Sequence, residues 1–198
     1  MPNSTIAQAL RDFFGSVHGP EMAVAVERLD HTTGDAPLVE DWEQVEFDFN
    51  RLFVGPMALA APPYASVYLD PEPVLMGRST LDVREVYHFL GLASPAENSL
   101  PDDHIALELD ACVAMHSAFT QNCTTELDAV WRVILQHHLQ QWIPKFVARI
   151  KNNTEVHPVF CYVAERLQTW LDTEVAALPP VTAEQSSHQE EQWYDTVQ

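Results

Sequence analysis

Apolar residues recur every three to four positions through most of the 198-residue chain, which is the spacing of one helix face. The pattern predicts helices over residues 3–14, 21–31, 39–53, 80–90, 101–119, 125–139, 145–151 and 154–171. The segment QQWIP is expected to break the helix near Gln141, between the sixth and seventh of these helices, and Pro144 is expected in the first turn of the seventh. No alternating run predicts a β-sheet. The sequence therefore predicts an all-α fold, a single-domain helical bundle of roughly seven to nine helices.

Short polar residues mark several of the expected helix starts. Ser79, with Asp82 three residues further on, matches a capping box in which Asp replaces Glu. Thr124 or Thr125 is the expected N-cap of the helix that follows, and Thr154 is the expected N-cap of the last one. These assignments divide the chain into helices joined by short turns.

Residues 49–77 interrupt the helical pattern with five prolines and two glycines, yet they are largely apolar. The sequence predicts a long apolar, proline-rich connecting loop with a function of its own. If the loop is extended, Tyr64, Ser66 and Tyr68 face one direction. Such a strip could line a groove for a peptide, or it could belong to the core; the sequence leaves both interpretations open.

The composition changes after residue 178. Residues 179–198 contain no Lys or Arg and are mostly polar, which is typical of a flexible or loosely docked tail. We therefore expect one helical domain over residues 1–178 and an acidic C-terminal tail over residues 179–198.

The chain has 10 basic and 29 acidic residues, a formal charge of −19, which disfavours nucleic acid and anionic membranes as partners. A cationic partner complements this charge, although acidity can also serve solubility alone. Acids crowd one side of the 39–53 helix and are expected to form a solvated face: Glu40, Asp41, Glu43, Glu46 and Asp48.

We expect a cytoplasmic protein. The N-terminal sequence has no secretory pattern, and no window of about 18 residues is apolar without a charge or proline, so no stable membrane insertion is expected. The cysteines Cys112, Cys123 and Cys161 lack the spacing of a metal or redox pair and are interpreted as free thiols.

Four residues near position 100 form the first candidate binding cluster. Asp102, Asp103 and His104 are expected in the first turn of a helix capped by Ser99, and His104 and Glu108 share a face. Carboxylates so placed suit a guanidinium, while helix capping alone is the simpler interpretation. The chain has no nucleophile elbow, phosphate-binding loop or zinc-protease motif, so no catalytic residues and no enzyme activity are expected.

Histidines form the second candidate site, which would bind a metal ion. Cys112 and His116 lie four apart, His137 and His138 are adjacent, and His157 follows. Adjacent helical residues point about 100° apart, so these pairs supply half a metal site at most. We expect no metal and no cofactor. A metal carrier, or a hydrolase using His104 with Asp103, is the less favoured alternative.

Two sequence blocks resemble the TorD/DmsD family of redox-enzyme maturation chaperones. They are RLFVGPMALAAPPYASVYLDPEPVLMG and LPDDHIALELD, and the later segment HHLQQWIPKFVARIKNNTEVHPVFCYVAERLQTWL is similar to the family's C-terminal helices. The resemblance implies an all-helical cytoplasmic chaperone without enzyme activity. It also implies binding of the twin-arginine signal peptide and precursor of a molybdenum-cofactor oxidoreductase, of the DMSO or TMAO reductase type, until the cofactor is inserted and Tat export proceeds.

The resemblance also assigns the peptide-binding residues. They are Tyr64, Ser66, Val67 and Tyr68 in the first block, and Pro101, Asp102, Asp103 and His104 in the second, to which Glu108 is added on the helix-face argument above. Leu100 stands where many members have Glu, and tyrosines stand where some have tryptophans. An accessory chaperone that acts on the folded part of another metalloenzyme is the alternative, and a homodimer formed by helix exchange is left open.

Overall fold

A computed structural model describes residues 2–56, 58–72, 77–89, 91, 100–121 and 124–179. Within these ranges the chain forms α-helices and two π-helical segments, η1 and η2, and no strand beyond a single bridge, which confirms the predicted all-α class. The elements are α1 (Pro2–Gly15), α2 (Gly19–Thr33), α3 (Trp42–Phe49), η1 (Asn50–Val54), α4 (Ser66–Leu69), α5 (Arg78–Phe89), α6 (Ile105–Gln121), α7 (Thr125–Arg132), η2 (Val133–Leu139), α8 (Gln140–Lys151) and α9 (Val159–Ala176). The proposed tail lies outside the described residues except for its first position.

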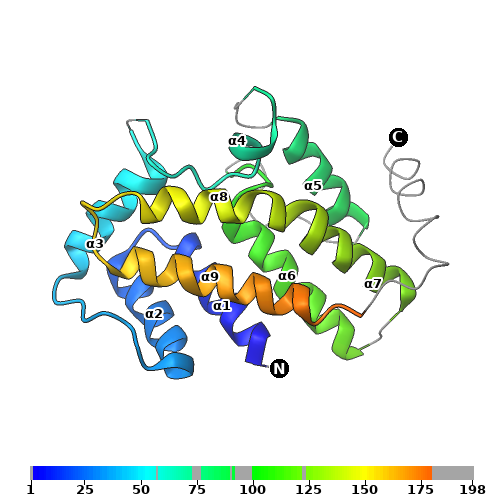
Figure 1. Ribbon diagram of the computed structural model, residues 1–198, viewed down its shortest axis with the longest axis horizontal. Helices are drawn as coiled ribbons and strands as arrows, with labels where there is room; N and C mark the ends of the chain where they lie inside the picture. Colours follow the sequence, from blue (N-terminus) through cyan, green and yellow to red (C-terminus); the bar gives the residue numbers. More distant parts are fainter. Residues whose placement is uncertain are drawn as a thin grey trace.

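The helices form two layers around one core (Figure 1). In the front layer α7, η2 and α8 make one long rod, and α9 runs back along it. Helices α1 and α6 pack together behind this pair, with α2 and α3 at one end. The short α4 and the helix α5 lie along the upper edge of the rod, on the side opposite α9.

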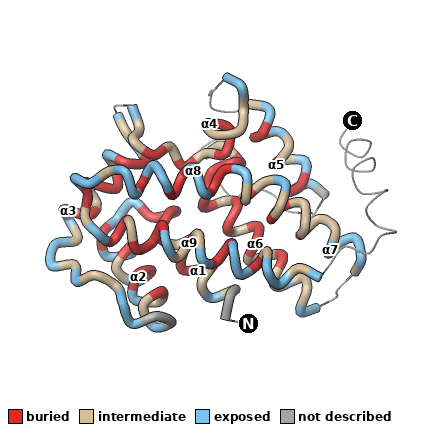
Figure 2. Tube along the Cα trace, in the orientation of Figure 1, coloured by how far each residue is buried: buried red, intermediate tan, exposed pale blue. Residues whose placement is uncertain are grey.

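Aromatic rings from five elements fill the centre of the bundle. Their centroids lie 4.9–6.0 Å apart, mostly edge to face, which is the arrangement that aromatic quadrupoles favour. Figure 2 shows the buried stretches where the helices face one another. The rings belong to Phe13, Phe14, Phe49, Phe53, Phe146 and Phe160.

No helix break occurs near Gln141, contrary to the sequence prediction, although this stretch contains Pro144. Pro144 lies inside α8, and its exposed ring faces solvent. The reason is the π-helix before it, in which hydrogen bonds run over five residues instead of four. The return to α-helical spacing begins at Gln140, four residues before Pro144, so the amide that proline lacks falls where the hydrogen-bond register already changes. The rod is therefore continuous from Thr125 to Lys151.

Two predicted helix starts are also wrong. Ser79 lies within α5 and does not cap it; its backbone N–H donates to Asp70 Oδ1 at 3.2 Å, and its hydroxyl also contacts that carboxylate. The last helix begins at Val159 and not after Thr154, because His157 Nδ1 accepts the Val159 N–H at 3.1 Å. The start of α5 is thus held by Asp70, which lies nine residues earlier, and the start of α9 is capped by a histidine, which is not among the common N-cap residues.

Thr124 is confirmed as an N-cap, since its hydroxyl accepts the Leu127 N–H at 3.2 Å. Of the acidic residues predicted to form a solvated face, Glu40, Asp41 and Glu43 are exposed, but Glu46 is half-buried and accepts the Gly19 N–H at 2.9 Å. Asp48 is buried and accepts the His157 N–H at 2.9 Å. Cys112 and Cys161 are free thiols, and Cys123 lies outside the described residues. No helix in the described ranges is long and apolar enough to cross a membrane.

Replacing Phe53 by Ala should lower the free energy of unfolding by about 3–5 kcal/mol, because its ring contacts four other phenylalanines and little can collapse into the space. Phe47→Ala is the matched control, since Phe47 is 64% exposed and its loss should change stability by less than about 1 kcal/mol. Urea unfolding followed by circular dichroism measures both. Equal losses in the two variants would contradict the aromatic core described above.

Candidate functional site

The two predicted blocks meet in one antiparallel β-bridge between Tyr64 and His104. The Ala65 N–H donates to the Asp103 carbonyl at 3.0 Å, and the Ile105 N–H donates to the Pro63 carbonyl at 2.9 Å. The Tyr64 and His104 rings lie edge to face with centroids 5.2 Å apart. The structure therefore joins the proline-rich loop to the start of α6 as one unit.

Asp103 holds the first turn of α4. Its Oδ2 accepts the Ser66 N–H at 2.8 Å, and both residues are 0% exposed. The remaining oxygens, Ser66 Oγ and Asp103 Oδ1, are buried and find no hydrogen-bond partner among the described residues. Neither residue is presented to solvent, so both position the site from inside.

The predicted extended strip is wrong, because residues Ser66–Leu69 form the helix α4. Tyr64 packs on His104, whereas Tyr68 stacks on Trp142 with centroids 5.7 Å apart, and its hydroxyl donates to the Pro62 carbonyl at 2.8 Å. Tyr64, Val67 and Tyr68 are each half-buried. The two tyrosines thus contact different neighbours, although each keeps part of its surface accessible.

Asp102 and Asp103 precede α6 instead of forming its first turn, and Ser99 lies outside the described residues. The residue that caps α6 is His104, whose Nδ1 accepts the Ala106 N–H at 3.2 Å. His104 is buried, and the loss of solvation lowers its pKa from 6.5 to about 4. Its imidazole is therefore neutral at neutral pH. The backbone N–H of His104 donates to the carbonyl of the half-buried Pro101 at 3.0 Å and closes the turn before the helix.

Asp102 already holds a guanidinium. Arg84 of α5 places Nε 2.5 Å from Asp102 Oδ2, and the Tyr87 hydroxyl donates to the Asp102 carbonyl at 3.0 Å. The Asp102 side chain is 7% exposed, but the Arg84 side chain is 40% exposed. This ion pair lies at the surface end of the site and ties α5 to the loop before α6.

Glu108 is buried on α6 and is satisfied by the rod. Its Oε1 lies 2.7 Å from His138 Nε2, and its Oε2 accepts the Trp142 Nε1–H at 3.1 Å. Burial raises the pKa of Glu108, although His138 opposes that shift. Burial alone lowers the pKa of His138, but the Glu108 carboxylate outweighs it and raises that pKa. The pair therefore retains a shared proton to a higher pH than an exposed carboxylate does.

The structure thus brings all nine predicted residues into one region, but it buries Ser66, Asp102, Asp103, His104 and Glu108. Sequence reasoning missed their partners Arg84, Tyr87, His138 and Trp142. His138 had been weighed only as a metal ligand beside His137, because a pair separated by 30 positions leaves no local spacing to detect. The indole N–H of Trp142 needs an acceptor when it is buried, but nothing in the sequence identifies Glu108 as that acceptor.

Metal ligation has no support among the described residues, which contain no group of three or more His, Cys, Asp or Glu side chains able to hold an ion. Three of the histidines in the sequence analysis make other contacts. His116 Nε2 lies 3.2 Å from Glu174 Oε1, His138 pairs with Glu108, and His157 caps α9.

The buried, neutral His104 predicts an acid-sensitive fold. The unfolded chain binds this proton near pH 6.5 and the folded chain only near pH 4, so His104 costs no stability above pH 6.5 and about 3 kcal/mol as pH falls toward 4. His104→Asn keeps an acceptor for the Ala106 N–H and removes the titration. Urea unfolding at pH 7 and pH 4.5 should show a steeper loss in the natural protein than in the variant. Identical slopes would contradict a neutral, buried His104.

Comparisons with known proteins agree with this architecture. Residues 19–148 match the family described as nitrate reductase delta subunit. A Tat proofreading chaperone DmsD of Salmonella typhi is 32% identical over 128 residues, covering 64% of this chain and 55% of that protein. A chaperone protein TorD of Aliivibrio salmonicida is 27% identical over 165 residues, covering 80% of this chain and 76% of that protein.

A solved structure of a candidate redox enzyme maturation protein from Archaeoglobus fulgidus has the same fold, with a TM-score of 0.61 at 18% identity, over 87% of this chain and 94% of that one. The chain spans a little over half of the Salmonella protein's length and 61% of a related DmsD of Haemophilus influenzae. The named relatives are chaperones and not enzymes. The family match covers 130 of the 198 residues, and the chain therefore belongs to the nitrate reductase delta subunit family, that of the TorD and DmsD chaperones.

Proposed function

We propose that the protein is a cytoplasmic chaperone that binds the twin-arginine signal peptide of a molybdoenzyme precursor and holds it until cofactor insertion, before Tat export. Family membership supports the class, since relatives carry the names of Tat proofreading and TorD chaperones. The molecule acts by binding, and no cofactor of its own is required.

The observation that carries this proposal is the ion pair between Arg84 and Asp102. The Asp102 carboxylate is nearly buried, so its guanidinium contact is only weakly screened by solvent. The partner arginine reaches it from the solvent side and remains 40% exposed. A guanidinium arriving from solvent with the same geometry can therefore compete with Arg84 for Asp102, and Arg84 shows that the position accepts this group.

The other predicted residues have more specific roles in this arrangement. Glu108 is satisfied by the rod, and Asp103 is 0% exposed and holds the Ser66 N–H through Oδ2, so both position the site from inside and do not contact the peptide. The half-buried Tyr64, Val67 and Tyr68 remain available to apolar parts of the peptide. His104 is neutral and does not repel the incoming arginine.

The overall charge of −19 favours the same partner. An acidic protein attracts a basic signal segment before contact, and this part of the attraction is screened by salt. Acidic residues also lie on the described part of α5 and the loop before it, where Glu72 and Glu85 are exposed and Asp82 is half-buried.

A fluorescent peptide with an arginine pair followed by an apolar stretch should bind at least tenfold more tightly than its Lys-Lys version, since Lys cannot reproduce the planar guanidinium contact. The affinity should fall as salt rises from 50 to 300 mM. Fluorescence anisotropy measures both effects. Equal binding of the two peptides would overturn the proposal and leave the folded part of a metalloenzyme as the client.

Arg84→Gln should strengthen binding of the Arg-Arg peptide several-fold, because it removes the competing guanidinium and leaves an amide donor near Asp102. Arg84→Lys is the control, since it keeps the charge near Asp102. Asp102→Asn should abolish the preference for Arg-Arg over Lys-Lys. Melting temperatures of all three variants separate binding effects from unfolding. Unchanged discrimination in Asp102→Asn would exclude Asp102 as the acceptor.

A further inference from the structure

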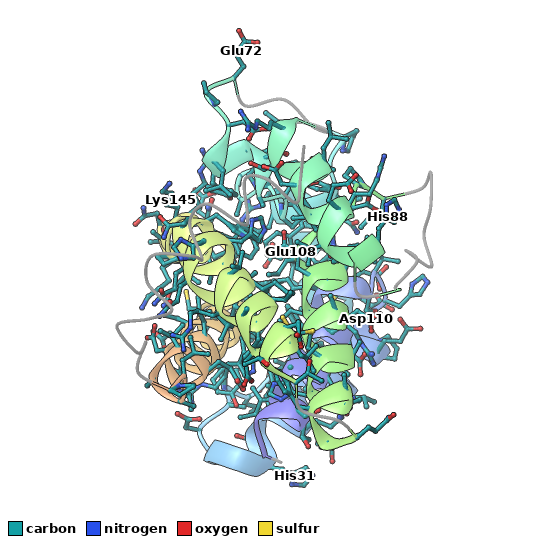
Figure 3. The ribbon with its side chains drawn as sticks, turned by 90° about the vertical axis from the view of Figure 1, so that its right-hand side faces the viewer. His31, Glu72, His88, Glu108, Asp110 and Lys145 are labelled. Atoms are coloured by element: carbon teal, nitrogen blue, oxygen red, sulfur yellow. The ribbon has the colours of Figure 1, made fainter. Side chains whose placement is uncertain are left out.

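A hollow of about 110 Å³ lies between α5, η2 and the floor formed by α6, and we name it the α5–η2 pocket. Figure 3 shows Glu108 in the space between the rod and the pair α5 and α6. Most of the lining is apolar. The pocket is formed by Asp82, Val83, Val86, Tyr87, Glu108, Ala111, Val133, Ile134, His137, His138 and Leu139.

The π-helix builds one wall of this pocket. Five of the eleven lining residues belong to η2, where the wider turn displaces side chains from the register of a regular helix. π-Helical segments cost stability and often occur at functional sites. The opposite wall is the inner face of α5, where Val83 and Tyr87 form an apolar cluster with Ala111 that is separate from the main core. The pocket thus lies at the boundary between two packed units.

The chemistry of the pocket selects an apolar occupant. Its polar base consists of Glu108 and His138, which satisfy each other and, through Glu108, Trp142. Both carboxylate oxygens of Glu108 are therefore in hydrogen bonds, and so is Nε2 of His138. The half-buried Asp82 and the exposed His137 are the remaining polar groups. A 150 Å³ apolar cavity accommodates benzene, so a hollow of this size suits one branched aliphatic or aromatic side chain.

The pocket adjoins the Asp102 site through Tyr87. Tyr87 lines the pocket, and its hydroxyl donates to the Asp102 carbonyl. Arg84, which pairs with Asp102, lies three residues earlier on the same helix. A peptide whose arginine competes for Asp102 therefore passes close to the pocket, so an apolar residue near that arginine can reach it.

We propose that the α5–η2 pocket receives one large apolar side chain from the apolar stretch of the client signal, beside the arginine that competes for Asp102. This inference rests on the proposed function and adds the feature that selects the apolar residue. The pocket serves as a second anchor, and the spacing between the arginine pair and the anchored residue then contributes to client choice.

The test combines an alanine scan of the peptide with a variant that fills the pocket. With the natural protein, one position of the apolar stretch should cost about tenfold in affinity when changed to Ala, as expected for two or three lost buried carbons. Val133→Phe places a ring at the half-buried wall of the pocket. This variant should lower the affinity for the parent peptide about tenfold. Replacing the sensitive peptide position by Ala should then cause no further loss of affinity.

Val24→Phe is the matched control, because Val24 is 56% exposed on α2 and does not line this pocket. This variant should bind the parent peptide with the affinity of the natural protein. Ala111→Leu fills the pocket from α6 and replaces Val133→Phe if that variant does not fold. The Arg-Arg to Lys-Lys ratio is measured throughout. If the natural protein prefers Arg-Arg and neither filling variant lowers the affinity for the parent peptide, the role of the pocket is overturned and the proposed function stands. If the natural protein binds the Arg-Arg and Lys-Lys peptides equally, the proposed function itself is overturned.

Discussion

The buried carboxylate of Glu108 is the interaction on which the arrangement of the site depends. A charge removed from water must find close partners, and Glu108 finds them in His138 and Trp142, 30 and 34 residues later in the chain. These contacts fix α6 against the rod at one register. Trp142 also stacks on Tyr68, so the same carboxylate indirectly holds the proline-rich loop and α4. One buried acid therefore links three parts of the chain.

The rest of the site is organised by polar contacts to the turn before α6. The Tyr64–His104 bridge and Asp103 hold the loop on one side of that turn, and Asp102 holds α5 on the other through Arg84 and Tyr87. The loop side is buried and stacked on the core. By contrast, α5 contributes its own small apolar cluster and leaves a hollow between itself and the rod. The proposed binding surface thus lies where the packing of the main core ends.

An acidic site in a protein of charge −19 does not require free carboxylates. Asp102 and Glu108 are paired in the structure, which lowers the cost of burying their charges. Asp103 accepts the Ser66 N–H through Oδ2, and its Oδ1 finds no hydrogen-bond partner among the described residues. The proposed recognition exchanges one guanidinium for another, because Arg84 already pairs with Asp102 in the structure. In this proposal Arg84 also makes the site selective, because only an incoming cation with the geometry of a guanidinium replaces its contact to Asp102 without losing hydrogen bonds.

Local sequence was enough to determine the helical class, the apolar faces that form the core, and the two blocks that meet at the site. Residues such as Phe13, Leu52 and Phe160 are buried as their spacing predicts, because helix periodicity is a property of neighbouring positions. The tertiary structure decided the partners. Asp70 supplies a contact to the start of α5, η2 lets the rod continue through Pro144, and Arg84 and His138 satisfy acids 18 and 30 residues away. Such pairings depend on how helices pack in space, and the energy of a buried charge depends on surroundings that no local spacing contains.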